Sequence, residues 1–286
     1  MHLAEKVIFA ATLATCVAMA APAQGQPAGA DEAMLSPLTY ADLADLSDAA
    51  TVVVKAQIRR QAQVEPERAP GLKPGFARLY IEAETLSLLT GNAPIGESLR
   101  YLVDVPLDSR GKPPKLKKQE VLLFARTGAG RPGELRLVGP GAQQPWSEIL
   151  ETRLRPILAE LVQPDSPAAV TGIRDAISVA GNLAGESETQ IFLSTTDGSP
   201  VSLTIVRRPG MSPVWGVSWS DIVDQAARPP QAGTLRWYRL ACFLPATIPA
   251  SANLSRDSES RTRAAQDYRL VVQQLGPCER TLPRPQ

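Results

Sequence analysis

Histidine is almost absent from this sequence, where the single copy is His2. The Ser–His and Cys–His pairs of many hydrolases need an imidazole to remove the proton of the nucleophile, and many zinc sites need one as a ligand. The sequence also has no P-loop and no GxGxxG segment after a strand, which are the usual sites of nucleotide cofactors. We therefore expect no cofactor and no imidazole-based metal site.

An excess of charge of either sign is also lacking, because 30 basic residues face 29 acidic ones. Such a chain has no global field that would attract nucleic acid, so nucleic acid is not expected as a partner. Hydrophobic residues make up 44% of the 286 positions, which is enough to bury a core. This length suits two modest domains.

Residues 1–23 have the layout of an export signal. Lys6 precedes an apolar run at 7–20, and small residues at 18–23 offer a cleavage site. The apolar run is shorter than the roughly 18 residues that a spanning helix needs. We expect cleavage, a periplasmic or secreted protein, and no transmembrane segment in the mature chain. Residues 24–38 are predicted to be a flexible leader.

Cleavage would remove both His2 and Cys16 and leave two cysteines, Cys242 and Cys278. In an oxidising compartment this pair is expected to form one structural disulfide. Lipidation of Cys16 is the alternative fate of the amino terminus, although Thr15 is an unfavourable residue directly before a lipidated cysteine.

The clearest pattern in the chain is a series of short segments in which apolar and polar residues alternate. They cover residues 51–61, 76–89, 98–105, 120–126 and 134–138. A period of two with one polar side is typical of antiparallel strands, whereas the fourth segment is apolar throughout and is expected to be buried on both faces. Five such strands favour a closed or half-closed barrel, because closure removes exposed edges.

A short helix at 40–49, capped near Thr39, is predicted to precede this barrel. The helix, the valine-rich strand after it, the Leu-Thr-Gly that ends the next strand and the apolar run at 120–126 resemble the OB-fold-like, netrin-type modules of exported proteins. In those modules a helix usually separates the third and fourth strands, but here that position holds LDSRGKPPKLKK, whose prolines and glycine oppose a helix. The inhibitor branch uses an amino-terminal cysteine that this chain lacks, so the resemblance does not imply protease inhibition.

Three further segments, SLRYLVDVPLDSRGKPPKLKKQEVLLFAR, GESETQIFLST and RWYRLACFLP, are similar to those of exported proteins of alphaproteobacteria. That resemblance extends over most of the mature chain and implies export. It implies no particular activity.

After residue 142 the period becomes helical. A bridging helix is expected within 143–166, kinked or split at Pro156. The region 167–280 is then predicted to be a second domain, in which a small antiparallel sheet is covered by helices, and residues 281–286 form a tail. Its strands are expected near 176–179 and at 189–194, 201–207 and 214–219. One helix is predicted at 263–275, whereas the period at 234–244 fits a helix or a strand. The predicted fold class is thus α+β, with a five-stranded antiparallel OB-like barrel at 39–142 followed by this smaller sheet.

The most distinctive candidate site is a cluster of basic residues between the third and fourth strands, stiffened by two prolines. It consists of Arg110, Lys112, Lys115, Lys117 and Lys118. These cations are suited to binding phosphate or carboxylate groups of an envelope polymer or a lipid head group. The alternative is a solvated hairpin tip. Ser109 and Lys112 have the SxxK spacing of Ser–Lys nucleophiles, but Gly111 and Pro113 oppose the helix that such a pair requires.

Two tryptophans form a second candidate site, because Trp215 and Trp219 point to the same side of a strand. They are either an aromatic platform for a sugar or a partner, or a sheet face packed under a helix. Glu82 and Glu84 also share a strand face, where arginines of neighbouring strands are expected to pair with them. We therefore expect a non-enzymatic module that binds an anionic envelope component or another exported protein. The alternative is a histidine-free hydrolase or lyase that uses carboxylates or a Ser–Lys pair.

Overall fold

The structure is a computed structural model, and it describes residues 37–91, 95–128, 133–220 and 228–285. The predicted export signal, His2, Cys16 and almost all of the leader lie outside these residues. Within the described residues, no helix combines the length and the apolar character that crossing a membrane requires.

The first sheet contains all five strands that the alternating pattern predicts. They are β1 (Val52–Gln63), β2 (Phe76–Gly91), β3 (Ser98–Pro106), β4 (Glu120–Thr127) and β5 (Leu135–Leu137), in the spatial order β3-β2-β1-β4-β5, with every neighbouring pair antiparallel. A sixth strand, β6 (Gln143–Pro145), also pairs with β4 and was not predicted, because its sequence QQP has no alternation of apolar and polar residues. A short 3-10 turn, η1 (Pro66–Arg68), lies between β1 and β2.

The two edges of this sheet are not joined by a continuous ladder of hydrogen bonds. A single parallel bridge connects Arg100 of β3 to Glu134, and the Arg100 N–H donates to the carbonyl oxygen of Gly133 at 2.8 Å. Among the described residues the first sheet is therefore a six-stranded antiparallel sheet that does not close.

The central strands are buried on both faces, as predicted for residues 120–126. Leu123 of β4 packs with β1, β2 and β3 side chains in one apolar cluster, whereas Leu122 and Phe124 belong to a second cluster with α1 (Tyr40–Ala49) and α2 (Glu148–Leu161). The second cluster continues into the other sheet through Leu203 and Tyr268. One of the two apolar clusters therefore extends through both predicted domains, whereas the other belongs to the first sheet alone.

Both helices near this core begin at a side-chain cap, and the cap of α1 is the predicted one. Thr39 and Asp42 form a reciprocal capping box at α1, and the Ser147 hydroxyl accepts the N–H of Leu150 at α2. α2 runs without interruption through Pro156, so the predicted split is not found. Apolar side chains on both sides of the proline hold the helix against the core, which offsets the lost backbone hydrogen bond.

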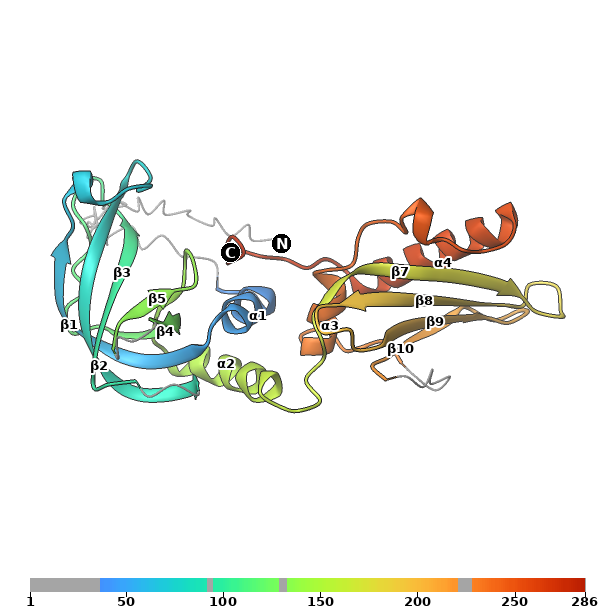
Figure 1. Cartoon of the computed structure of the whole chain (residues 1–286), viewed down its shortest axis with the longest axis horizontal. Coiled ribbons are helices and arrows are strands. Elements are labelled where there is room, and N and C mark those ends of the chain that lie inside the picture. The colour runs from blue at the N-terminus through green and yellow to red at the C-terminus, as the bar shows by residue number, and fades with distance from the viewer. Residues whose placement is uncertain (1–36, 92–94, 129–132, 221–227, 286) are drawn as a thin grey trace, which may run out of the picture. The chain divides into compact units, whose positions relative to one another are not determined.

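The second sheet is a four-stranded antiparallel meander. It consists of β7 (Val170–Ala180), β8 (Ser187–Thr195), β9 (Val201–Arg207) and β10 (Val214–Ser218). Asp197 and Gly198 lie in the turn from β8 to β9, with Gly198 at φ +79° and the Ser199 N–H bonded to the Asp197 carboxylate. The long helix α4 (Ser258–Leu275) packs along β7 and β8 (Figure 1).

The apolar segment whose period was ambiguous forms a helix, α3 (Leu235–Ala241), capped by the Thr234 hydroxyl. A 3-10 turn, η2 (Ala250–Ala252), precedes α4. The described chain is thus α+β, with two antiparallel sheets and four α-helices.

Candidate functional site

The basic cluster lies on the connection from β3 to β4, which begins with a tight turn. The carboxylate of Asp108 accepts the backbone N–H groups of Arg110 at 2.9 Å and Lys112 at 2.8 Å. The Asp108 N–H in turn donates to the Lys112 carbonyl oxygen at 2.9 Å. Gly111 has φ +71°, so the helical geometry that an SxxK nucleophile needs is absent at Ser109 and Lys112.

The second half of this connection is fixed to β1. The Gln61 side chain accepts the Leu116 N–H at 2.6 Å and donates to the Pro114 carbonyl oxygen at 2.9 Å. Leu116 is buried in the apolar cluster of the first sheet, and the Lys118 N–H donates to the carbonyl oxygen of Ile58 at 2.7 Å. We call residues 107–119 the basic loop. Hydrogen bonds hold it at both its first and its second half.

The charged side chains of the basic loop all point to solvent. Arg110, Lys112, Lys115, Lys117 and Lys118 are exposed. Within the described parts of the chain, none of them lies within ion-pair distance of a carboxylate. The structure therefore brings together five cations with no acidic partner.

The strands beside the basic loop have the opposite arrangement, because their charges are paired across the ladder. Glu84 pairs with Arg59, Glu82 lies 3.4 Å from Arg60, and Arg78 forms a bidentate pair with Asp104. A lattice of surface ion pairs was predicted here. The arginines that pair with Glu82 and Glu84, Arg60 and Arg59, both come from β1.

Trp215 lies on a face of β10 that packs against α4, and Trp219 lies directly after the end of this strand. Trp215 is 5% exposed and its indole Nε1 donates to the Gln274 side chain of α4 at 2.7 Å. Trp219 is partly buried against the same core. This position corresponds to the alternative of a covered sheet face, and it leaves no open aromatic platform at Trp215.

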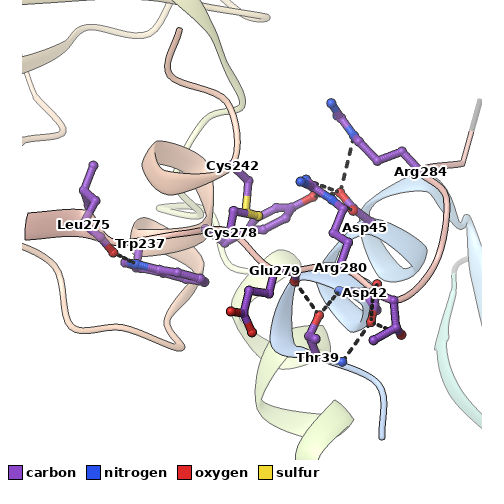
Figure 2. The surroundings of a disulfide bond; sticks show 12 residues. Thr39, Asp42, Asp45, Trp237, Cys242, Leu275, Cys278, Glu279, Arg280 and Arg284 are labelled. Atoms are coloured by element: carbon purple, nitrogen blue, oxygen red, sulfur yellow. Dashed lines mark hydrogen bonds and ion pairs between the residues drawn. A yellow bond between two sulfur atoms is a disulfide. The ribbon is translucent and has the colours of Figure 1, made fainter. Parts of the chain in front are cut away.

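A second cluster of charges, which sequence analysis did not identify as a site, lies on α1. Asp42, Asp45 and Asp48 recur every three residues on one side of the helix. Asp45 accepts the Tyr238 hydroxyl at 2.6 Å and Arg280 Nε at 2.5 Å (Figure 2). The sequence shows only that the three acids alternate with Leu43 and Leu46, and this pattern does not separate them from solvated positions.

The other two acids bind segments that are equally distant in sequence. Asp48 forms two hydrogen bonds, at 2.7 and 2.8 Å, to the guanidinium of Arg239 on α3. Asp42 accepts the backbone N–H groups of Thr281 and Leu282, each at 3.0 Å. Figure 2 shows the position of Asp42 on α1. We call residues 279–285 the carboxyl-terminal strap. The acidic row of α1 thus joins the first sheet to α3 and to this strap.

The disulfide fixes the beginning of the strap. Cys242, directly after α3, is bonded to Cys278, directly before the strap (Figure 2). The predicted pairing of these cysteines is confirmed, and its position is structural. It holds the end of α3, the end of α4 and the strap together.

Acid is expected to weaken the attachment of the strap to α1. Burial opposes ionisation of Asp42, but hydrogen bonds from the Thr281 hydroxyl and from the backbone of Thr39, Leu282 and Thr281 outweigh it and lower the pKa of Asp42 below its ordinary 3.8. Because the folded pKa is the lower one, this contribution to the free energy of unfolding is complete above the unfolded pKa and is lost as the pH falls through the folded one.

The variant Asp42→Asn should therefore lose less of its free energy of unfolding than the native protein between about pH 5 and about pH 3. Urea unfolding at both pH values measures this difference. Asp165→Asn, at an exposed position, is the control and should keep the native acid dependence. An equal acid dependence in Asp42→Asn and the native protein would contradict the assignment.

No group of three or more acidic, cysteine or histidine side chains suited to a metal ion occurs among the residues that the structure describes. Comparison with protein-family models finds no match to the chain, and comparison with curated proteins finds no significant relative. The geometry of the basic loop and of the acidic row is therefore the basis for any functional conclusion.

Proposed function

We propose that the protein is an exported, non-enzymatic module that binds a phosphate-bearing anionic component of the cell envelope through the basic loop. The observation that carries this proposal is the five exposed cations of the loop, which have no carboxylate partner in the described chain. Export to the periplasm or beyond, and kinship with exported proteins of alphaproteobacteria, belong to the same proposal. They rest on the amino-terminal pattern and on the sequence resemblance.

Mutual repulsion is the physical argument against a merely solvated loop. Like charges held on a short, fixed backbone raise the local positive potential, and a multivalent anion relieves that repulsion. Each basic residue near an anionic membrane surface contributes about 1 kcal/mol of attraction. On the neighbouring strands Arg59, Arg60 and Arg78 have acidic partners, so ion pairing is possible on this surface, and the described basic loop does not use it.

The proposal includes an OB-like, half-closed barrel as the scaffold of the loop. The spatial order β3-β2-β1-β4-β5 and the parallel bridge between Arg100 and Glu134, which brings the two edges near each other, support this scaffold. In contrast, the carboxylates on which the hydrolase or lyase alternative depends, Glu82 and Glu84, are occupied by Arg60 and Arg59.

Vesicle binding tests the proposal. The native protein should sediment with vesicles of phosphatidylglycerol in phosphatidylcholine and not with phosphatidylcholine alone. Replacing all five basic residues of the loop with glutamine should weaken binding at least about tenfold. Raising the ionic strength from about 0.1 M to about 1 M should have the same effect, because the screening length falls from roughly 10 to 3 Å. Competition by soluble polyphosphate distinguishes a phosphate polymer from a lipid surface as the preferred ligand.

A matched variant separates the loop from total charge. It carries five glutamine substitutions at exposed arginines elsewhere, namely Arg136, Arg208, Arg236, Arg256 and Arg269. Both variants have the same net charge, so a local site predicts loss of binding only in the loop variant. Equal loss in both variants, or equal binding of the native protein to neutral vesicles, would overturn the proposal.

A further inference from the structure

A buried polar network connects α4 to the second sheet, away from the basic loop. The carboxylate of Asp267 is 0% exposed and accepts the Thr189 hydroxyl at 2.5 Å and Arg207 Nε at 2.6 Å. The Thr189 hydroxyl lies 2.9 Å from that of Ser178, which accepts Arg263 Nε at 3.0 Å. Buried ion pairs are often no more stabilising than apolar packing. A contribution to stability therefore does not by itself explain why these polar side chains are buried here.

The network borders a hollow of about 730 Å³, a volume typical of sites for small molecules. The hollow is lined by the β7–β8 hairpin, by the first turns of α4 and by both arginines of the network. The side chains of Arg207 and Arg263 are 30% and 16% exposed. Hydrogen bonds to buried groups thus fix each guanidinium, while part of each arginine side chain stays exposed to solvent. In a preorganised binding site, the side chains that contact the ligand are held in position by such neighbouring hydrogen bonds.

An independent observation at the same hollow is the hydroxyl of Ser187. Ser187 lines the hollow and is 4% exposed, yet its Oγ has no hydrogen-bond partner among the described residues. It is two residues before Thr189 on β8 and directly opposite Arg207 on β9, so its side chain shares the sheet face that α4 covers. Buried hydroxyls are normally hydrogen-bonded, and an exception calls for a missing partner.

Two acidic side chains, Glu186 and Glu259, lie at the rim of the hollow, and Arg263 also donates from Nη2 to the Ser260 hydroxyl at 2.9 Å. Glu186 accepts the backbone N–H groups of Asn182 at 3.1 Å and Leu183 at 3.2 Å, both with Oε2, which ties this oxygen to the hairpin. Glu259 is 88% exposed and lies 3.5 Å from Arg263, so solvent screens that pair. Arg207 directs Nε and Nη2 to Asp267, and its Nη1 has no acceptor in the described chain.

We propose that this hollow binds a phosphate group, as inorganic phosphate or a small phosphate monoester, between Arg207, Arg263 and the Ser187 hydroxyl. Arginine is the side chain best matched to phosphate oxygens. The donors come from two strands and one helix, hence from different directions. A phosphate offers three terminal oxygens that also point in different directions, whereas a planar carboxylate offers only two.

Calorimetric titration of the purified protein with inorganic phosphate and with glycerol 3-phosphate tests this site. Saturable binding is expected, and the tighter of the two ligands shows whether the site prefers the free ion or the ester. Arg263→Gln should weaken phosphate binding at least about tenfold, because it removes a charged hydrogen-bond donor. Ser187→Ala should weaken it by a few fold without lowering the melting temperature, since this hydroxyl has no partner in the folded chain.

Arg269→Gln, an exposed position on the same helix outside the hollow, is the matched control and should bind phosphate like the native protein. Native affinity in Ser187→Ala together with native affinity in Arg263→Gln would overturn the proposal. So would an absence of saturable binding to either phosphate, or a preference for succinate over phosphate. The basic-loop variant should keep this affinity, so the two proposals fail independently.

Discussion

Reduction of the Cys242–Cys278 disulfide is expected to lower the melting temperature by about 10 °C. The bond closes a loop of 36 residues. In the chain-entropy model it removes roughly 4 kcal/mol of freedom from the unfolded state, and each kcal/mol corresponds to about 2–4 °C in a chain of this size. The double variant Cys242→Ser, Cys278→Ser should melt at the temperature of the reduced native protein.

Differential scanning calorimetry with and without reductant measures this effect. The double variant is its own control, because reductant should not change its melting temperature. A native protein that melts at the same temperature in both conditions would show that the bond does not constrain the chain.

Replacing Arg239 with methionine is expected to reduce the free energy of unfolding by roughly 2–3 kcal/mol. Arg239 is 4% exposed and donates to Asp48 of α1 and, at 3.1 Å, to the carbonyl oxygen of Pro167. Removal of one partner of a buried pair typically costs 3–5 kcal/mol, and the cost is smaller here because Asp48 keeps partial contact with water.

Arg236 provides a matched control on the same helix, because its side chain is exposed. Arg236→Met should change the free energy of unfolding by no more than about 0.5 kcal/mol, as is usual for surface substitutions. Urea unfolding of both variants measures the difference. Equal stability of the two variants would mean that the junction of α1 with α3 does not depend on this ion pair.

The strands were predictable because each has one buried side, which appears in the sequence as an alternation of apolar and polar residues. β4 was recognised in the same way by its continuous apolar run, which follows from its position between two layers of core. The hairpin at Asp197 and Gly198 was predictable because few residues adopt the turn that it requires. These features depend on neighbours in sequence or on the period alone.

The acidic row of α1 was not predictable, because its partners are the Tyr238 hydroxyl, Arg239 and the strap, about 190–240 residues away. From the sequence, Asp45 between Leu43 and Leu46 is indistinguishable from a solvated position. The hollow beside Arg207 was missed for the same reason, since β8, β9 and α4 each contribute a single donor or acceptor. At Pro156 the sequence predicted a kink or a split of the helix. α2 is instead continuous through the proline, because apolar side chains on both sides of it pack against the core.

The most direct test of the basic loop as a binding surface is lysine acetylation, with the rate at each lysine measured by mass spectrometry. The account predicts that vesicles containing phosphatidylglycerol slow acetylation of Lys112, Lys115, Lys117 and Lys118, while Lys55, which pairs with Glu120 of β4, keeps its rate. Phosphatidylcholine vesicles should change none of these rates. Unchanged rates at the four loop lysines, under conditions in which the protein sediments with anionic vesicles, would contradict the account.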